Sequence, residues 1–159
     1  MKNMRNMQRS KEIGSEFWLD YYPKDIASVS QETLVLSGRT ALDIIIKDIM
    51  KVRKIRNAYL PAYCCDSMID PFIRNGIDVK LYDIDFDGGL KYLIDADAET
   101  DIFYVNNYFG YENTIGNKII EHFKQKGAII IYDKTHSLFM TNDATDALAD
   151  YTFASIRKW

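Results

Sequence analysis

The segment IIIYDKTHS places a carboxylate, Asp133, directly after an apolar run, and a histidine, His136, three residues later. A carboxylate in a cleft can orient a cationic ring nitrogen, bind a metal ion or act as a base, and an imidazole offers a flat ring or a proton carrier. The structural alternative is that Asp133 caps the following loop and His136 is simply exposed. Polar groups at the ends of parallel strands usually lie in the ligand cleft, which favours a functional role.

Two further segments could complement this pair. The turn SGRTA, from Ser37 to Ala41, opens a helical pattern, and its free backbone N–H groups, the Arg39 guanidinium and the Thr40 hydroxyl could hold a phosphate. Ser37 could equally be a plain helix cap without a ligand.

Near the end of the sequence, YTFASIRKW places Ser155 three residues before Lys158. An enclosed lysine can condense with an aldehyde, and a nearby serine hydroxyl can hold a phosphate. Taken alone, the segment is also compatible with an ordinary strand that has a solvated basic end.

The segment LPAYCC could place a flat or soft side chain, from Tyr63 or Cys65, against a bound ring. The two cysteines could instead be buried filler, a common role for small free thiols. With only two histidines and no CxxC spacing, the sequence predicts no metal site.

Alternating patterns indicate how these segments are positioned. Helical spacing is present over residues 38–51, 68–73 and 115–126, and apolar strand-like runs occur at 58–60, 79–84, 101–105 and 128–132. Continuous apolar strands between helices predict an α/β fold: a mostly parallel sheet with helices on both faces, in three layers, whose sites lie beyond the carboxyl ends of the strands.

The chain has 159 residues, of which 20 are basic and 23 acidic, so its net charge is −3. This balance argues against a nucleic-acid partner. No apolar run approaches the ~18 residues that cross a bilayer, and adjacent Cys64 and Cys65 cannot close a loop within one chain. These features predict a cytoplasmic protein without a membrane partner, with a flexible leader at 1–16 and one domain at 17–159.

The order of these segments is more specific than any one of them. In SGRTAL, LPAYCCDSMIDPFIRNGIDVKLYDID, IIIYDKTHS and ADYTFASIRKW, the sequence resembles the DegT/StrS group of nucleotide-sugar aminotransferases, which are fold-type-I enzymes dependent on pyridoxal 5'-phosphate (PLP). The resemblance runs from Phe17 to the last residue and implies the PLP-binding large domain.

The resemblance also implies roles for the candidate residues. Lys158 would hold PLP covalently and shuttle a proton, and Asp133 would pair with the pyridine nitrogen. The phosphate would lie at Gly38, Arg39, Thr40 and Ser155, and the ring against His136, Tyr63 and Cys65. Arg39 and Cys65 depart from the group's usual small hydroxyl and aromatic residues, and Asn107 replaces a frequent histidine. Tyr108 matches a segment near the substrate mouth.

By the same resemblance, a small-molecule amino donor and a keto acceptor such as a nucleotide sugar would be the substrates, and the full-length form would be a homodimer. The group continues beyond the equivalent of Lys158, so we expect a truncated large domain that is inactive alone. Two alternatives remain: a non-catalytic phosphate- or nucleotide-binding module, and a phosphotransfer or hydrolase domain using Asp133 with Mg²⁺ held by Asp83, Asp85 and Asp87.

Overall fold

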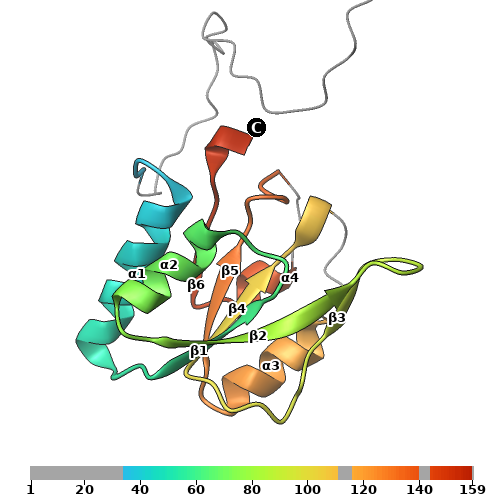
Figure 1. Ribbon diagram of the computed structural model, residues 1–159, viewed down its shortest axis with the longest axis horizontal. Coiled ribbons are helices and arrows are strands. Elements are labelled where there is room, and N and C mark those ends of the chain that lie inside the picture. The colour runs from blue at the N-terminus through green and yellow to red at the C-terminus, as the bar shows by residue number, and fades with distance from the viewer. Residues whose placement is uncertain (1–33, 111–115, 140–143, 159) are drawn as a thin grey trace, which may run out of the picture. The chain divides into compact units, whose positions relative to one another are not determined.

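A six-stranded sheet runs through the residues that the computed structural model describes, 34–110, 116–139 and 144–158 (Figure 1). Its strand order is β3-β2-β1-β4-β5-β6, and all neighbouring pairs are parallel except β2 with β3. The strands are β1 (Asn57–Pro61), β2 (Asp78–Asp85), β3 (Lys91–Leu93), β4 (Ile102–Asn106), β5 (Ile129–Asp133) and β6 (Tyr151–Phe153).

Helices cover both faces of this sheet. They are α1 (Gly38–Val52), α2 (Asp66–Arg74), α3 (Asn117–Gln125) and α4 (Ala144–Leu148), with 3-10 turns at η1 (Tyr108–Gly110) and η2 (Ile156–Lys158). On one face, α1 and α2 pack Leu42, Ile46 and Phe72 against β1, β4 and β5. On the other face, α3 packs Ile120 and Phe123 against the alternate residues of the same strands. The predicted three-layer α/β fold with a mostly parallel sheet is confirmed.

The predicted elements agree with the structure where periodicity was strong. The helices expected at 38–51 and 68–73 are α1 and α2, and the four apolar runs are β1, β2, β4 and β5. Ile115, where the third helical pattern begins, and the leader at 1–16 lie outside the described residues. The sequence did not indicate β3 or α4, because strands and helices of three and five residues are too short to show a period.

Asp101 ties the start of β4 to the segment before β1. Its buried carboxylate accepts hydrogen bonds from the Arg56 amide at 2.7 Å and the Arg53 guanidinium at 3.2 Å. Burial by itself would raise the pKa of Asp101, but the hydrogen bonds from Arg56 and Asn57 and the charges of Arg53 and Arg56 hold that pKa below its ordinary value.

A depressed pKa means that the stabilisation is present above the unfolded-state pKa of about 4 and is lost as the pH falls through the folded-state value. We therefore expect Asp101→Asn to destabilise the fold by about 1–3 kcal/mol at pH 7. The deficit should shrink as urea unfolding is repeated from pH 4 downwards. The exposed Glu99→Gln is the control; a deficit for Asp101→Asn that stays constant with pH would contradict this account.

Candidate functional site

The carboxyl ends of three neighbouring strands bring the candidate residues to one edge of the sheet. Asn106 at the end of β4 is opposite Asp133 at the end of β5, and Asp133 is opposite Phe153 at the end of β6. Side chains alternate between faces along a strand, so Asn106 and Asp133 lie on the α1 and α2 face, as do Tyr104 and Ile131 two residues earlier. In Figure 1 the start of α1 lies toward this same end of the strands.

Asp133 is a buried carboxylate, 5% exposed, with a partner on each oxygen. Its Oδ2 accepts a hydrogen bond from the Tyr104 hydroxyl at 2.7 Å, and its Oδ1 accepts one from the Thr135 amide at 2.8 Å. A carboxylate offers about four acceptor positions, so these two bonds leave capacity for a cationic or N–H ligand. The bond to Thr135 is of the loop-capping kind, so Asp133 also orders the segment that follows β5.

The start of α1 has the geometry of an anion site. The Ser37 hydroxyl caps the helix by accepting from the Thr40 amide at 3.2 Å, and it is also hydrogen bonded to the Thr40 hydroxyl at 3.0 Å. The first amides of a helix have no intrahelical acceptor, so those of Gly38 and Arg39 are available to an anion. The cap therefore occupies the Thr40 amide, and the Gly38 and Arg39 amides remain available.

Ser155 lies beside this turn, although 117 positions separate it from Gly38 in the sequence. A Cβ built on Gly38 would lie 3.6 Å from the Ser155 Cβ and 3.6 Å from the Phe153 ring. The Ser155 amide donates to the Thr135 hydroxyl at 3.0 Å, and the Thr135 amide donates to Asp133. A short chain of contacts thus joins Gly38, Ser155 and Asp133, and η2, which contains Lys158, follows Ser155 directly.

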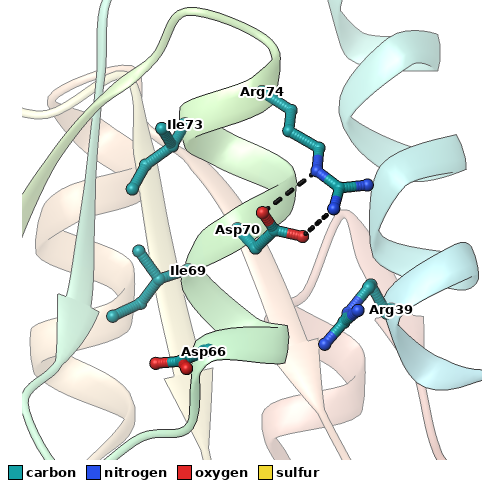
Figure 2. A pocket seen from close by; sticks show the side chains of 6 residues that line it. All are labelled: Arg39, Asp66, Ile69, Asp70, Ile73 and Arg74. Carbon is teal, nitrogen blue, oxygen red and sulfur yellow. Dashed lines mark hydrogen bonds and ion pairs between the residues drawn. The ribbon is translucent and has the colours of Figure 1, made fainter.

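The Arg39 side chain leaves this turn in another direction. It reaches from α1 toward α2 and lines an open pocket of about 400 Å³ (Figure 2). The far wall is formed by residues of α2: Asp66, Ile69, Asp70, Ile73 and Arg74. The Asp70 carboxylate is already paired with Arg74 at 2.9 Å. The structure therefore offers the Arg39 amide to the helix-start site and directs its guanidinium to this pocket.

Two of the three candidate ring contacts, Tyr63 and Cys65, lie near the end of β1 and the start of α2. Tyr63 is 53% exposed, and its ring meets Phe86 and Tyr108 edge-on at 5.2 and 5.5 Å. Cys65 is the exposed N-cap residue of α2, with its Sγ 2.9 Å from the Ser67 hydroxyl. Buried filler is therefore the wrong description of Cys65, whereas burial raises the pKa of the partly covered Cys64 thiol.

His136 is stacked on Phe109, with ring centroids 5.6 Å apart. Its Nδ1 accepts a hydrogen bond from the Phe109 amide at 3.3 Å, which requires this nitrogen to be unprotonated. Phe109 has φ of 58°, a left-handed conformation that is rare for an aromatic residue, and strained residues of this kind cluster at functional sites. The next residue must be small, because a Cβ on Gly110 would lie 3.0 Å from the His136 carbonyl oxygen.

Two residues of the site were not singled out from the sequence. Tyr104 reads as one more apolar position of β4, although a buried tyrosine hydroxyl normally requires a partner. Asn106 is 3% exposed, and its Oδ1 has no hydrogen-bond partner among the described residues. A buried amide oxygen beside the Asp133 position is a signal for a ligand donor, because such atoms are normally satisfied.

The phosphotransfer alternative does not fit this arrangement. Asp83 and Asp85 are on β2, and Asp87 is in the turn that follows, where its amide donates to Asp85. Because β1 and β4 lie between β2 and β5, the strand that carries Asp83 and Asp85 is three strand spacings, roughly 14 Å, from the strand that carries Asp133. The part of the chain that the structure describes contains no group of three or more His, Cys, Asp or Glu side chains that could hold a metal ion.

Comparison with known proteins places the fold. No family model matches the sequence, and no curated protein matches it. Solved structures do match: a PLP-bound protein from Clostridium difficile that is classed as an aminotransferase, at 12% identity and a TM-score of 0.54 over 76% of this chain. A chain of the SepCysS–SepCysE N-terminal domain complex matches at 14% identity, with a TM-score of 0.56 over 77% of this chain. 3-Amino-5-hydroxybenzoic acid synthase matches at 18% identity, with a TM-score of 0.51 over 64% of this chain.

The TM-scores of these three matches show a shared α/β fold, the fold that the sequence resemblance implied, and one of the matched structures is PLP-bound. The chain spans about a third of the length of the structures it matches, 36%, 36% and 27% respectively.

Among the helices within the described ranges, none combines the length and the apolar character needed to cross a membrane.

Proposed function

We propose that this chain forms the cofactor-binding part of a PLP-dependent transaminase. The observation that carries the proposal is the convergence of Asp133, the α1 start and Ser155 at one edge of the sheet. PLP, when bound, supplies an electron sink at a cationic ring, together with a phosphate and an aldehyde. Asp133 offers a partner to the ring, and the α1 start with Ser155 offers donors to the phosphate.

The described residues fit this cofactor. The Gly38 and Arg39 amides and the Ser155 hydroxyl would bind the phosphate, with the Thr40 hydroxyl, already linked to Ser37, beside them. The buried Asp133 carboxylate would keep the ring nitrogen protonated. The orphaned Asn106 Oδ1 offers a further acceptor to a ligand in the same place.

The remaining roles rest on the sequence resemblance. Lys158 would bind the cofactor aldehyde and move a proton at the substrate α-carbon. His136, Tyr63 and Cys65 would flank the ring, with His136 held in place by Phe109. An amino acid donor and a keto acceptor, by this resemblance a nucleotide-linked keto-sugar, would be the substrates. We propose that turnover requires further parts of the fold, because the matched region covers only 36% of the PLP-bound structure. By the resemblance, the active form would be a homodimer.

Reductive labelling tests this proposal directly. The purified chain is incubated with PLP, reduced with borohydride and digested, and the modified peptide is identified by mass spectrometry. We expect about one label per chain on Lys158, lost in Lys158→Ala and retained in Lys118→Ala, which removes a lysine from α3 on the opposite face of the sheet. Label spread over surface lysines and unchanged by Lys158→Ala would support the non-catalytic binding module instead.

A further inference from the structure

Tyr104 is a fully buried polar side chain next to the candidate site. It is 0% exposed, in the middle of β4, and its ring lies between Phe72 of α2 and Phe153 of β6, both edge-on with centroids 6.3 Å away. Phe153 is also the ring that a Cβ on Gly38 would touch. Because close packing fixes the rotamer of such a ring, the position of the Tyr104 hydroxyl is set by α2 and β6 together.

The Tyr104 hydroxyl acts on one specific atom. It donates to Oδ2 of Asp133 at 2.7 Å, while the Thr135 amide holds Oδ1 at 2.8 Å. Two donors on different oxygens fix both the position and the plane of the carboxylate. Burial, and then the charge of Asp133, raise the pKa of Tyr104 well above its ordinary value, so the hydroxyl keeps its proton and remains the donor.

We propose that Tyr104 is a positioning residue that holds the Asp133 carboxylate in a fixed orientation, aimed at the ring nitrogen of a bound cofactor. This inference rests on the proposed function for the identity of the ligand, but the hydrogen bond from Tyr104 to Asp133 is present without a ligand. A hydroxyl donor stabilises a buried carboxylate as an anion, since charge-assisted hydrogen bonds are roughly twice as strong as neutral ones. Without this donor, the Asp133 carboxylate keeps only the hydrogen bond from the Thr135 amide, and its plane can rotate about that bond.

The matched pair of variants is Tyr104→Phe and Tyr82→Phe. Both remove one hydroxyl from a fully buried ring in neighbouring parts of the core. The Tyr82 hydroxyl donates at 3.0 Å to the backbone carbonyl of Tyr104, not to Asp133. A general effect of losing a buried hydroxyl should therefore appear in both variants, whereas an effect on Asp133 should appear only in Tyr104→Phe.

Two readouts separate this inference from the proposed function. The first needs no cofactor: in Tyr104→Phe we expect the NMR signal of the Thr135 amide proton to shift and its hydrogen exchange to accelerate about tenfold, with neither change in Tyr82→Phe. The second is the PLP affinity, which should fall about tenfold in Tyr104→Phe, the scale of one lost hydrogen bond to a charged group. Affinity for inorganic phosphate should stay unchanged.

An unaltered Thr135 amide in Tyr104→Phe, or equal changes in Tyr82→Phe, would overturn the positioning role even if the wild type binds PLP at Lys158. Conversely, if the Thr135 amide changes as expected but the wild type does not bind PLP, the positioning of Asp133 by Tyr104 is supported and the proposed function is rejected. If Tyr104→Phe fails to fold, the wild-type chain provides a second measurement. A slowly exchanging Tyr104 hydroxyl proton should be visible and should be lost in Asp133→Asn; its absence in the wild type would contradict the hydrogen bond.

Discussion

Replacing Asp133 with asparagine is expected to lower the affinity for PLP between about ten- and a hundredfold, the range for losing a hydrogen bond to a charged group. The carboxylate sits at the end of β5 with the Tyr104 hydroxyl and the Thr135 amide as donors. An asparagine can present only one oxygen to these two donors, and it offers no charge to a protonated ring nitrogen. Titration of the wild type and the variant, followed by the absorbance of bound PLP, measures this difference.

The phosphate end of the site provides the internal control for Asp133→Asn. The α1 start binds through backbone amides that this substitution does not touch, so the affinity for inorganic phosphate should remain within about twofold, less than the effect of one ordinary hydrogen bond. Asp78→Asn, an exposed carboxylate at the start of β2, should change neither affinity. Equal losses of PLP and phosphate affinity in Asp133→Asn would mean that Asp133 supports the fold and does not bind the ring.

Phe103→Ala is expected to lower the free energy of unfolding by about 3–5 kcal/mol, the usual cost of deleting a buried aromatic ring. The ring is 0% exposed in β4 and stacks on Phe123 of α3, with centroids 4.2 Å apart. It also contacts Tyr59 of β1 and Tyr82 of β2, at 6.1 and 5.9 Å. Removal leaves a cavity between α3 and the strand that carries Tyr104 and Asn106. Urea unfolding followed by circular dichroism measures the loss.

The control for Phe103→Ala is Phe103→Leu, which keeps most of the volume and should cost less than about 1.5 kcal/mol. Similar losses in the two variants would indicate that the stacked geometry with Phe123 matters more than the volume filled. A loss below about 1.5 kcal/mol in Phe103→Ala would contradict the tight packing of α3 on this face of the sheet.

Local sequence patterns were sufficient to predict the elements whose apolar residues follow a regular spacing along the chain. The i, i+3, i+4 spacing of Leu42, Ile45, Ile46 and Ile49 predicts α1, and Ser37 caps it as expected. The apolar run before Asp133 predicts a strand buried on both faces, and its burial pattern agrees. Because parallel strands end at one edge of a sheet, this prediction also placed Asp133 in the candidate site.

Contacts between distant segments could not be predicted from local sequence patterns. The pairing of Asn106 with Asp133, the hydroxyl of Tyr104 on that carboxylate and the closeness of Gly38 to Ser155 each depend on strand order. The direction of the Arg39 side chain depends on where α2 lies. None of these leaves a periodic signal, because the partners are separated by 27 to 117 positions in the sequence.

The sequence by itself therefore determined the alternation of helices and strands, the fold class and the residue types available for chemistry, since these follow from short-range spacing and side-chain polarity. Only the tertiary structure decided which of those residues meet, that Asp133 is held by Tyr104 and that Phe109 takes a left-handed backbone against His136. The reason is physical: burial, strand register and helix packing fix the directions of side chains, and these are properties of the assembled layers and not of any single segment.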